Sequence, residues 1–145
     1  MSHEIVLGCA ACGVRNRVHL ERLADEPVCG GCKAKLLDGS HPLELDDESF
    51  PAVMSGSKKP VLVDFWAAWC GPCRSFAPTL ERFAREHAAQ VLVVKVNVDV
   101  ARRVAAQHQI SSIPTICVFQ DGKETARHVG GMSIPELQRL ACVPA

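Results

Sequence analysis

The chain has 145 residues, enough for one ordinary domain and a small appendage. With 48% hydrophobic and 22% charged residues it has the composition of a folded globular protein, which excludes a disordered chain. Its 16 basic residues balance 16 acidic ones, which argues against a nucleic acid or an anionic membrane surface as the main partner. No apolar run approaches the roughly 20 residues that a membrane span needs.

Eight cysteines are the most informative feature of the composition. The N-terminus, MSHEIVLGCAAC, lacks the basic start and apolar core of a signal peptide, so we expect a cytoplasmic protein. Structural disulfides are rare in the cytoplasm, and cysteines there serve metal binding or redox chemistry more often than stapling. Six of the eight form Cys-x-x-Cys pairs that read CAAC, CGGC and CGPC.

Residues 1–40 contain too few large apolar side chains to bury a core of their own. Segments of about 40 residues usually need a metal, disulfides or a partner in order to fold. A turn-forming cluster at 38–42 then suits a linker. We therefore predict a small module over residues 1–40 and a second domain over 41–145.

Four cysteines of the first module have the spacing of a four-thiolate zinc ribbon: Cys9, Cys12, Cys29 and Cys32. Each pair lets two sulfurs converge at a tight turn, and two such turns complete a tetrahedron around one structural Zn²⁺. Metal binding would supply the folding free energy that the segment lacks. Local or crossed disulfides, or iron in place of zinc, remain alternatives. Three histidines could in principle replace a thiolate: His3, His19 and His41.

From Leu43 onward, strand and helix patterns alternate. The runs at 61–66 and 90–99 are apolar and β-branched, which is typical of strands covered on both faces. In chain order we expect a helix starting near 46–49, a strand at 61–66, a helix at 74–87, a strand at 90–99, a short helix at 99–107, a hairpin of 115–120 and 123–129, and a helix opening at Ser133. This order predicts an α/β fold with a mixed central sheet flanked by helices.

The third pair, Cys70 and Cys73, follows a predicted buried strand and opens a predicted helix. Helical periodicity turns Cys73 toward the core, and Cys70 lies at the helix start, where unpaired N–H groups and the dipole stabilise an anion. The helix end should therefore lower the pKa of Cys70, whereas burial should keep Cys73 a thiol. Pro72 suits the first helical turn because its missing N–H has no partner there. This asymmetry predicts redox chemistry for the third pair.

The segment FWAAWCGPC with a proline later in the same helix resembles the active site of the thioredoxin family, and the resemblance runs from Leu43 to the C-terminus. With the four-cysteine segment added, the whole chain is similar to the zinc-binding thioredoxin-2 type. The resemblance implies a thioredoxin fold in which Cys70 attacks, Cys73 resolves and the two form the redox disulfide. It also implies that no organic cofactor is bound.

Further positions match the family's active site. Asp64 is a lone charge in an apolar run, and burial should raise its pKa; the resemblance implies that it accepts a proton from Cys73. Lys95 matches a lysine near that carboxylate; a plain solvent-facing lysine is the alternative interpretation. Ile113 and Pro114 match a cis-proline turn beside the cysteines. The remaining matches form the spacer and the rim of the substrate groove: Gly71, Pro72, Trp66, Trp69, Val129 and Gly130. Core packing alone would also explain Trp66.

These features predict a protein-disulfide reductase that acts as a monomer on disulfide-containing proteins and is recycled by an NADPH-dependent thioredoxin reductase. The uncharged Gly-Pro spacer favours a reductant, because a cation between the cysteines would over-stabilise the thiolate. One alternative is a disulfide isomerase or oxidase. A second is a redox-sensing interaction module, in which oxidation of the thiolates ejects zinc and alters a partner surface.

Overall fold

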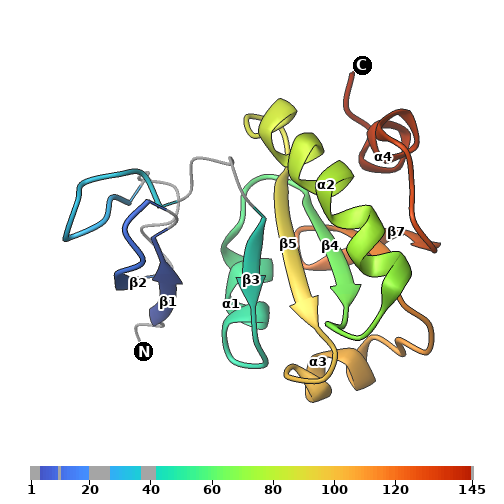
Figure 1. Cartoon of the computed structure of the whole chain (residues 1–145), viewed down its shortest axis with the longest axis horizontal. Coiled ribbons are helices and arrows are strands. Elements are labelled where there is room, and N and C mark those ends of the chain that lie inside the picture. The colour runs from blue at the N-terminus through green and yellow to red at the C-terminus, as the bar shows by residue number, and fades with distance from the viewer. Residues whose placement is uncertain (1–3, 10, 20–26, 37–41, 145) are drawn as a thin grey trace.

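The computed structural model describes residues 4–9, 11–19, 27–36 and 42–144. An N-terminal hairpin consists of β1 (Glu4–Gly8) and β2 (Arg15–His19). The larger domain follows with β3 (Leu43–Leu45), α1 (Ser49–Gly56), β4 (Val61–Trp66), α2 (Gly71–Glu86), β5 (Leu92–Asn97), α3 (Arg102–Gln107), β6 (Thr115–Gln120), β7 (Lys123–Val129) and α4 (Ile134–Ala141). Figure 1 shows the hairpin beside β3, the first strand of the larger sheet.

The larger sheet has the strand order β3-β5-β4-β6-β7. Its first three strands run parallel, and β6 and β7 are antiparallel additions. The sheet is therefore mixed, as the strand and helix order predicts. The central strand β4 is almost fully buried along its length because helices cover both of its faces.

Alternate residues of β4 enter two separate cores. Val61, Val63 and Phe65 belong to a cluster that includes side chains of α1 and α3. Leu62 belongs to the second cluster, with side chains of α2 and α4. Asp64 and Trp66 share the face of Leu62, so β4 presents them to the α2 layer rather than to the α1 layer.

Most expected elements are confirmed. The strands at 61–66, 115–120 and 123–129 have the predicted bounds, and the 90–99 run shortens to β5. Helix α2 begins at Gly71 rather than at 74 and continues through Pro78. Ser133 caps α4 as expected, since its hydroxyl accepts the N–H of Glu136 at 3.3 Å. The sequence interpretation missed the hairpin strands β1 and β2 and the edge strand β3, which are too short to show a clear period.

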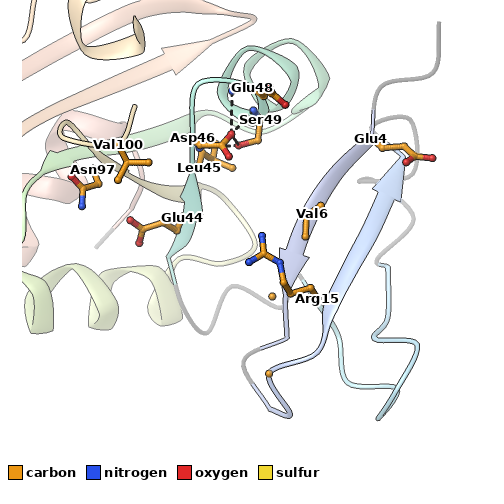
Figure 2. Close-up of a pocket in the computed structure, with 12 residues that line it drawn as sticks. Glu4, Val6, Arg15, Glu44, Leu45, Asp46, Glu48, Ser49, Asn97 and Val100 are labelled. Carbon is orange, nitrogen blue, oxygen red and sulfur yellow. Dashed lines mark hydrogen bonds between the residues drawn. The ribbon is translucent and has the colours of Figure 1, made fainter. Parts of the chain in front are cut away.

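The hairpin packs against the larger domain near α1. Leu7 and Val18 are buried and belong to the same cluster as Leu45 and Phe50. Beside this contact a cleft of about 680 Å³ separates the hairpin from β3 and the start of α1. Figure 2 shows Arg15 on one side of this cleft and Glu44 on the other. Within the described residues no helix is long and apolar enough to cross a membrane.

Candidate active site and metal centre

The junction between β4 and α2 positions the third cysteine pair. Strand β4 ends at Trp66 and helix α2 begins at Gly71, so Cys70 is the residue that precedes the helix and caps it. Its backbone is extended, with φ −85° and ψ 112°, whereas Cys73 is already helical. The two residues form a disulfide with their Cα atoms 5.3 Å apart. A strand that feeds directly into a helix thus brings both sulfurs to one helix end.

The environments of Cys70 and Cys73 differ in hydrogen bonding and not in exposure. The exposed fractions are 5% for Cys70 and 3% for Cys73, so burial does not distinguish them, contrary to the argument from helical periodicity. The backbone N–H of Cys73 points at the Cys70 sulfur at 3.2 Å. Such a donor at a helix N-terminus favours a thiolate at Cys70. Of the two causes expected from the sequence, the helix end therefore distinguishes the two residues in this structure and burial does not.

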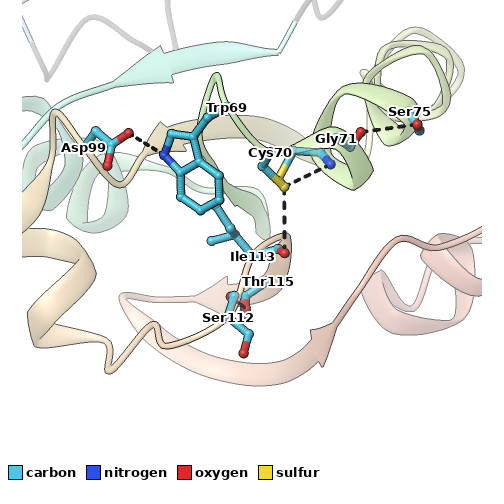
Figure 3. Close-up of a disulfide and its surroundings, with 9 residues drawn as sticks. Trp69, Cys70, Gly71, Ser75, Asp99, Ser112, Ile113 and Thr115 are labelled. Atoms are coloured by element: carbon cyan, nitrogen blue, oxygen red, sulfur yellow. Dashed lines mark hydrogen bonds between the residues drawn. A yellow bond between two sulfur atoms is a disulfide. The ribbon is translucent and has the colours of Figure 1, made fainter.

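The turn before β6 lies against this sulfur. The Ile113–Pro114 peptide bond is cis, as the resemblance implies. The carbonyl oxygen of Ile113 lies 3.8 Å from the Cys70 sulfur, and Figure 3 shows the two groups facing each other. The Pro114 carbonyl accepts the N–H of Gly130 at 2.8 Å, and Gly130 has φ +102°, a conformation that glycine adopts readily. Two loops far apart in the sequence therefore meet beside Cys70.

Asp64 is buried beneath the α2 layer. Its exposed fraction is 1%, and neither carboxylate oxygen has a hydrogen-bond partner among the described residues. Burial raises the pKa of Asp64 to about 7, although the Lys95 ammonium acts in the opposite direction. Trp66 shares the face of Asp64 and packs against the small cluster that contains Cys70 and Cys73. A carboxyl group whose pKa is raised to about 7 therefore lies on the face of β4 that is covered by α2, the helix of the cysteine pair.

Lys95 is not a plain solvent-facing lysine. It pairs with Asp64 in the β4–β5 register, and its ammonium lies 4.2 Å from the centre of the Trp66 ring. A cation over an indole face is a stabilising contact. Trp66 is only partly buried and contacts both the cysteine cluster and Lys95, so it connects the charged groups of the sheet to the redox pair.

Two of the residues predicted to form the rim of the site are exposed: Trp69 is 68% exposed and Val129 is 59% exposed. Val129 pairs with Thr115, the residue that follows the cis-proline. The Trp69 indole N–H donates to Asp99 at 2.9 Å, which fixes the ring in Figure 3. Asp99 was not predicted as a site residue. Its position just after β5 was the available signal, because β4 and β5 are parallel and their carboxyl ends meet at one edge.

The four N-terminal cysteines converge on one point. Their sulfurs all lie within 4.8 Å of one another, and none of the four forms a disulfide. Two contacts cross between the turns, Cys9 to Cys32 and Cys12 to Cys29, each with 3.6 Å between sulfurs. Four sulfurs about 2.3 Å from Zn²⁺ would be about 3.8 Å apart in a tetrahedron. The residues therefore fit a tetrahedral thiolate site for a metal ion.

Backbone donors around the cluster favour thiolates. The N–H groups of Cys32 and Gly31 lower the pKa of Cys29 to about 6. Backbone N–H groups also lower the pKa of Cys9. Of the histidines considered as ligands, His19 lies 3.5 Å from Glu4 instead, and His3 and His41 lie outside the described residues. Among the described residues, the four cysteine sulfurs form the ligand set.

Comparisons with known proteins agree with this geometry. The family model described as Thioredoxin matches residues 41–141, and one described as Thioredoxin 2, N-terminal, matches residues 8–34. Thioredoxin C-3 of Corynebacterium nephridii is 38% identical over 135 residues, which cover 93% of this chain and 92% of that protein. A bifunctional thioredoxin reductase/thioredoxin of Mycobacterium leprae is 46% identical over 97 residues, 67% of this chain and 21% of that protein.

Among solved structures, a mutant thioredoxin from Halobacterium salinarum superposes with a TM-score of 0.65 at 30% identity, covering 72% of this chain and 90% of that one. The mixed sheet, the cysteine pair at the start of α2 and the four-cysteine cluster all agree with these matches. The chain therefore belongs to the thioredoxin family, as a thiol-disulfide oxidoreductase of the type that carries a thioredoxin-2 ribbon at its N-terminus.

Proposed function

We propose that this protein reduces disulfides in other proteins, with Cys70 as the attacking thiol and Cys73 as the resolving thiol. The observation that carries the proposal is the Cys73 N–H directed at the Cys70 sulfur, beside the Ile113 carbonyl. The sulfur that can be held as a thiolate is thus the one next to a backbone acceptor for a substrate strand. No charged residue separates the cysteines, which favours a reductant over an oxidase or isomerase.

The first step forms a mixed disulfide. The Cys70 thiolate attacks one sulfur of the target disulfide, a bond forms between these two sulfurs, and the second target sulfur leaves as a thiolate that takes up a proton from solvent. The thiolate is nucleophilic because the helix end stabilises its charge. The exposed rim residues Trp69 and Val129 offer an apolar surface to an extended target segment, and the Ile113 carbonyl can accept its backbone N–H.

The second step releases the product. Cys73 loses its proton to Asp64, and the resulting thiolate attacks the Cys70 sulfur. The mixed disulfide breaks, the Cys70–Cys73 disulfide forms, and the target leaves as its second thiolate. Two electrons have then passed from the dithiol to the target. A base that titrates near pH 7 suits this role, because it can accept the proton and later return it to solvent.

The oxidised pair must be reduced again. We propose an NADPH-dependent thioredoxin reductase as the donor, which is supported by the fusion of both activities in the name of the Mycobacterium leprae relative. Four thiols held without disulfides favour a reducing compartment such as the cytoplasm. We propose that the protein acts there as a monomer on disulfide-containing proteins, and not on nucleic acids or membranes.

We propose one structural Zn²⁺ per chain, held by Cys9, Cys12, Cys29 and Cys32. When bound, the ion would tie the hairpin turn to the second turn near Val28, which the Gly30 N–H also joins to the hairpin by donating to the Asn16 side chain at 2.9 Å. The hairpin residues Leu7 and Val18 bury little apolar surface beyond their contact with the larger domain, so the ligand bonds contribute to folding of this module.

Replacing Cys73 by serine should trap targets. Cys70 can still attack, but no thiol remains to expel the product, so mixed disulfides accumulate and turnover with insulin as substrate stops. Non-reducing gel electrophoresis and mass spectrometry of the trapped adduct measure this outcome. The matched variant Cys70→Ser should trap nothing, and adducts formed through Cys73 in that variant would reverse the two roles.

Replacing Asp64 by asparagine should change how stability depends on pH. The folded-state pKa of about 7 lies above the unfolded value, so the wild-type protein loses stability as pH rises from about 4 to 7 and the loss is complete above that. From pH 5 to pH 8, ionisation of this group lowers the free energy of unfolding by about 2.5 kcal/mol. Urea unfolding of the oxidised protein at both pH values should show a smaller difference for Asp64→Asn; an equal difference would contradict a buried, titrating Asp64.

The metal site predicts one zinc per chain by native mass spectrometry. Chelation should remove the ion and expose four thiols to alkylation, with loss of amide protection in the hairpin. Cys12→Ser should weaken metal binding, whereas Cys142→Ser changes an exposed cysteine outside the cluster and should leave the zinc content at one. Bound iron, or a disulfide between two of the four ligands in the purified protein, would refute the zinc assignment.

The zinc site also has the exposure expected of a redox-sensitive one. Cys12 and Cys32, one from each turn, are exposed, whereas Cys9 and Cys29 are buried. Peroxide can oxidise two of these thiolates to a disulfide while it is reduced to water, and the ion would then leave. We expect zinc release, followed with a metal-binding dye, at peroxide concentrations that leave the fold of the larger domain intact. Retention of zinc until that domain unfolds would assign the site a structural role alone.

A further inference from the structure

Three charged residues form one row across the sheet. Glu44 on β3 pairs with Lys95 on β5, and Lys95 pairs with Asp64 on β4. Paired residues of neighbouring strands point to the same face, so all three side chains lie on the α2 side of the sheet. Lys95 therefore lies between two carboxylates, one at the sheet edge and one in its interior.

The Lys95 ammonium is held between the two acids without being bound to either. It lies over the Trp66 ring at 4.2 Å, and no ion pair joins it to an acid in the part of the chain that the structure describes. The Trp66 indole N–H is buried and has no hydrogen-bond partner among the described residues. The contact that Trp66 makes with this row is therefore the one between its ring and the Lys95 ammonium.

Lys95 acts on both acids, and Glu44 acts on Asp64. Besides burial, which raises the pKa of Asp64, Lys95 lowers it and Glu44 raises it. Burial likewise raises the pKa of Glu44, and Lys95 and then Trp66 act against that. Without Glu44, no nearby negative charge would act against Lys95. Lys95 would then stabilise the Asp64 carboxylate more strongly and make it a weaker base for the Cys73 proton.

Glu44 is the member of the row that meets solvent. It is exposed on the edge strand β3 and lines the cleft between the sheet and the hairpin. In Figure 2 its carboxylate points away from the hairpin, toward the side of Asn97. Asp64, in contrast, is 1% exposed. The charge that tunes the buried acid is therefore at the surface, where it can be changed without opening the core.

We propose that Glu44 is a positioning residue for the reaction: it shares Lys95 with Asp64 and thereby keeps Asp64 able to take up the proton of Cys73 near neutral pH. The proposal rests on the role of Asp64 given above. Among the described residues, the charges that act on the pKa of Asp64 are those of Lys95 and Glu44. Beyond Asp64 in the row lie Ile116 on β6 and then His128 on β7, and α2 presents the cysteine pair.

The test is the titration of Asp64 itself, followed by the carboxyl carbon resonance in ¹³C NMR of the full-length, zinc-loaded, oxidised protein. Glu44→Gln removes the charge and keeps the shape. We expect the midpoint of Asp64 to fall by about half a pH unit, which is about a threefold change in the ratio of its ionised to its protonated form, since Glu44 lies two strand spacings, about 10 Å, away. Lys95→Met should move the midpoint the other way, and Glu44→Gln should have a smaller effect in that background.

Two controls keep the result specific. Glu48→Gln removes another carboxylate of the same cleft that is outside the row, and the Asp64 midpoint should not move. Glu44→Asp keeps the charge and should restore most of the wild-type midpoint. An unchanged or raised midpoint in Glu44→Gln, or an equal fall in Glu48→Gln, would overturn the proposal.

The titration is independent of turnover. If Asp64→Asn reduced insulin at the wild-type rate, the role of Asp64 as a base would fail, yet the coupling of Glu44 to Asp64 would still be measurable. If the role of Asp64 holds, the pH profile of insulin reduction by Glu44→Gln should shift to lower pH together with the midpoint. A merely structural role of Glu44 would lower the melting temperature and leave both midpoints in place.

Discussion

The active site depends on backbone N–H groups at the start of a helix that have no partner within the helix, one of which points at a sulfur. Strand β4 is buried on both faces and passes into α2 within a few residues, so the first N–H groups of α2 have no helical partner. One of them, on Cys73, points at the Cys70 sulfur. This contact and the Ile113 carbonyl beside the Cys70 sulfur distinguish two cysteines of nearly equal burial. The first of these contacts depends on where the strand stops and the helix starts.

The same sheet carries an acid that reduces the stability of the fold. Asp64 has no hydrogen-bond partner among the described residues, and its ionisation inside the α2 layer is unfavourable. A core built for stability alone would place an apolar residue there. The arrangement becomes intelligible if the acid must exchange a proton with Cys73, because only a destabilised carboxylate titrates near neutral pH. Lys95 and Glu44 then set how strongly it is destabilised.

The N-terminal module follows a different principle. Its hairpin strands are five residues each, and its contribution to the core consists of a few side chains such as Leu7 and Val18. Four sulfurs that converge with tetrahedral spacing can replace the missing core, since metal binding and folding are then one event. Six of the eight cysteines thus share a Cys-x-x-Cys spacing but serve two purposes. A Cys-x-x-Cys pair with a second pair of thiolates nearby indicates a metal site. A pair at a helix N-terminus indicates redox chemistry.

The sequence by itself determined the elements whose signal is local. The apolar run of β4, the Asp-Gly turn between β6 and β7, the serine cap of α4 and both kinds of cysteine pair can be recognised in a few consecutive residues. The tertiary structure decided what depends on register between strands and on loops that meet across the fold. The resemblance placed Lys95 near Asp64, but the position of Glu44 on the other side of Lys95 was not predicted, because strand pairing over long separations is not encoded in any one segment. The contact of Asp99 with Trp69 likewise depends on the tertiary structure, because it follows from how β4 and β5 end at one edge of the sheet.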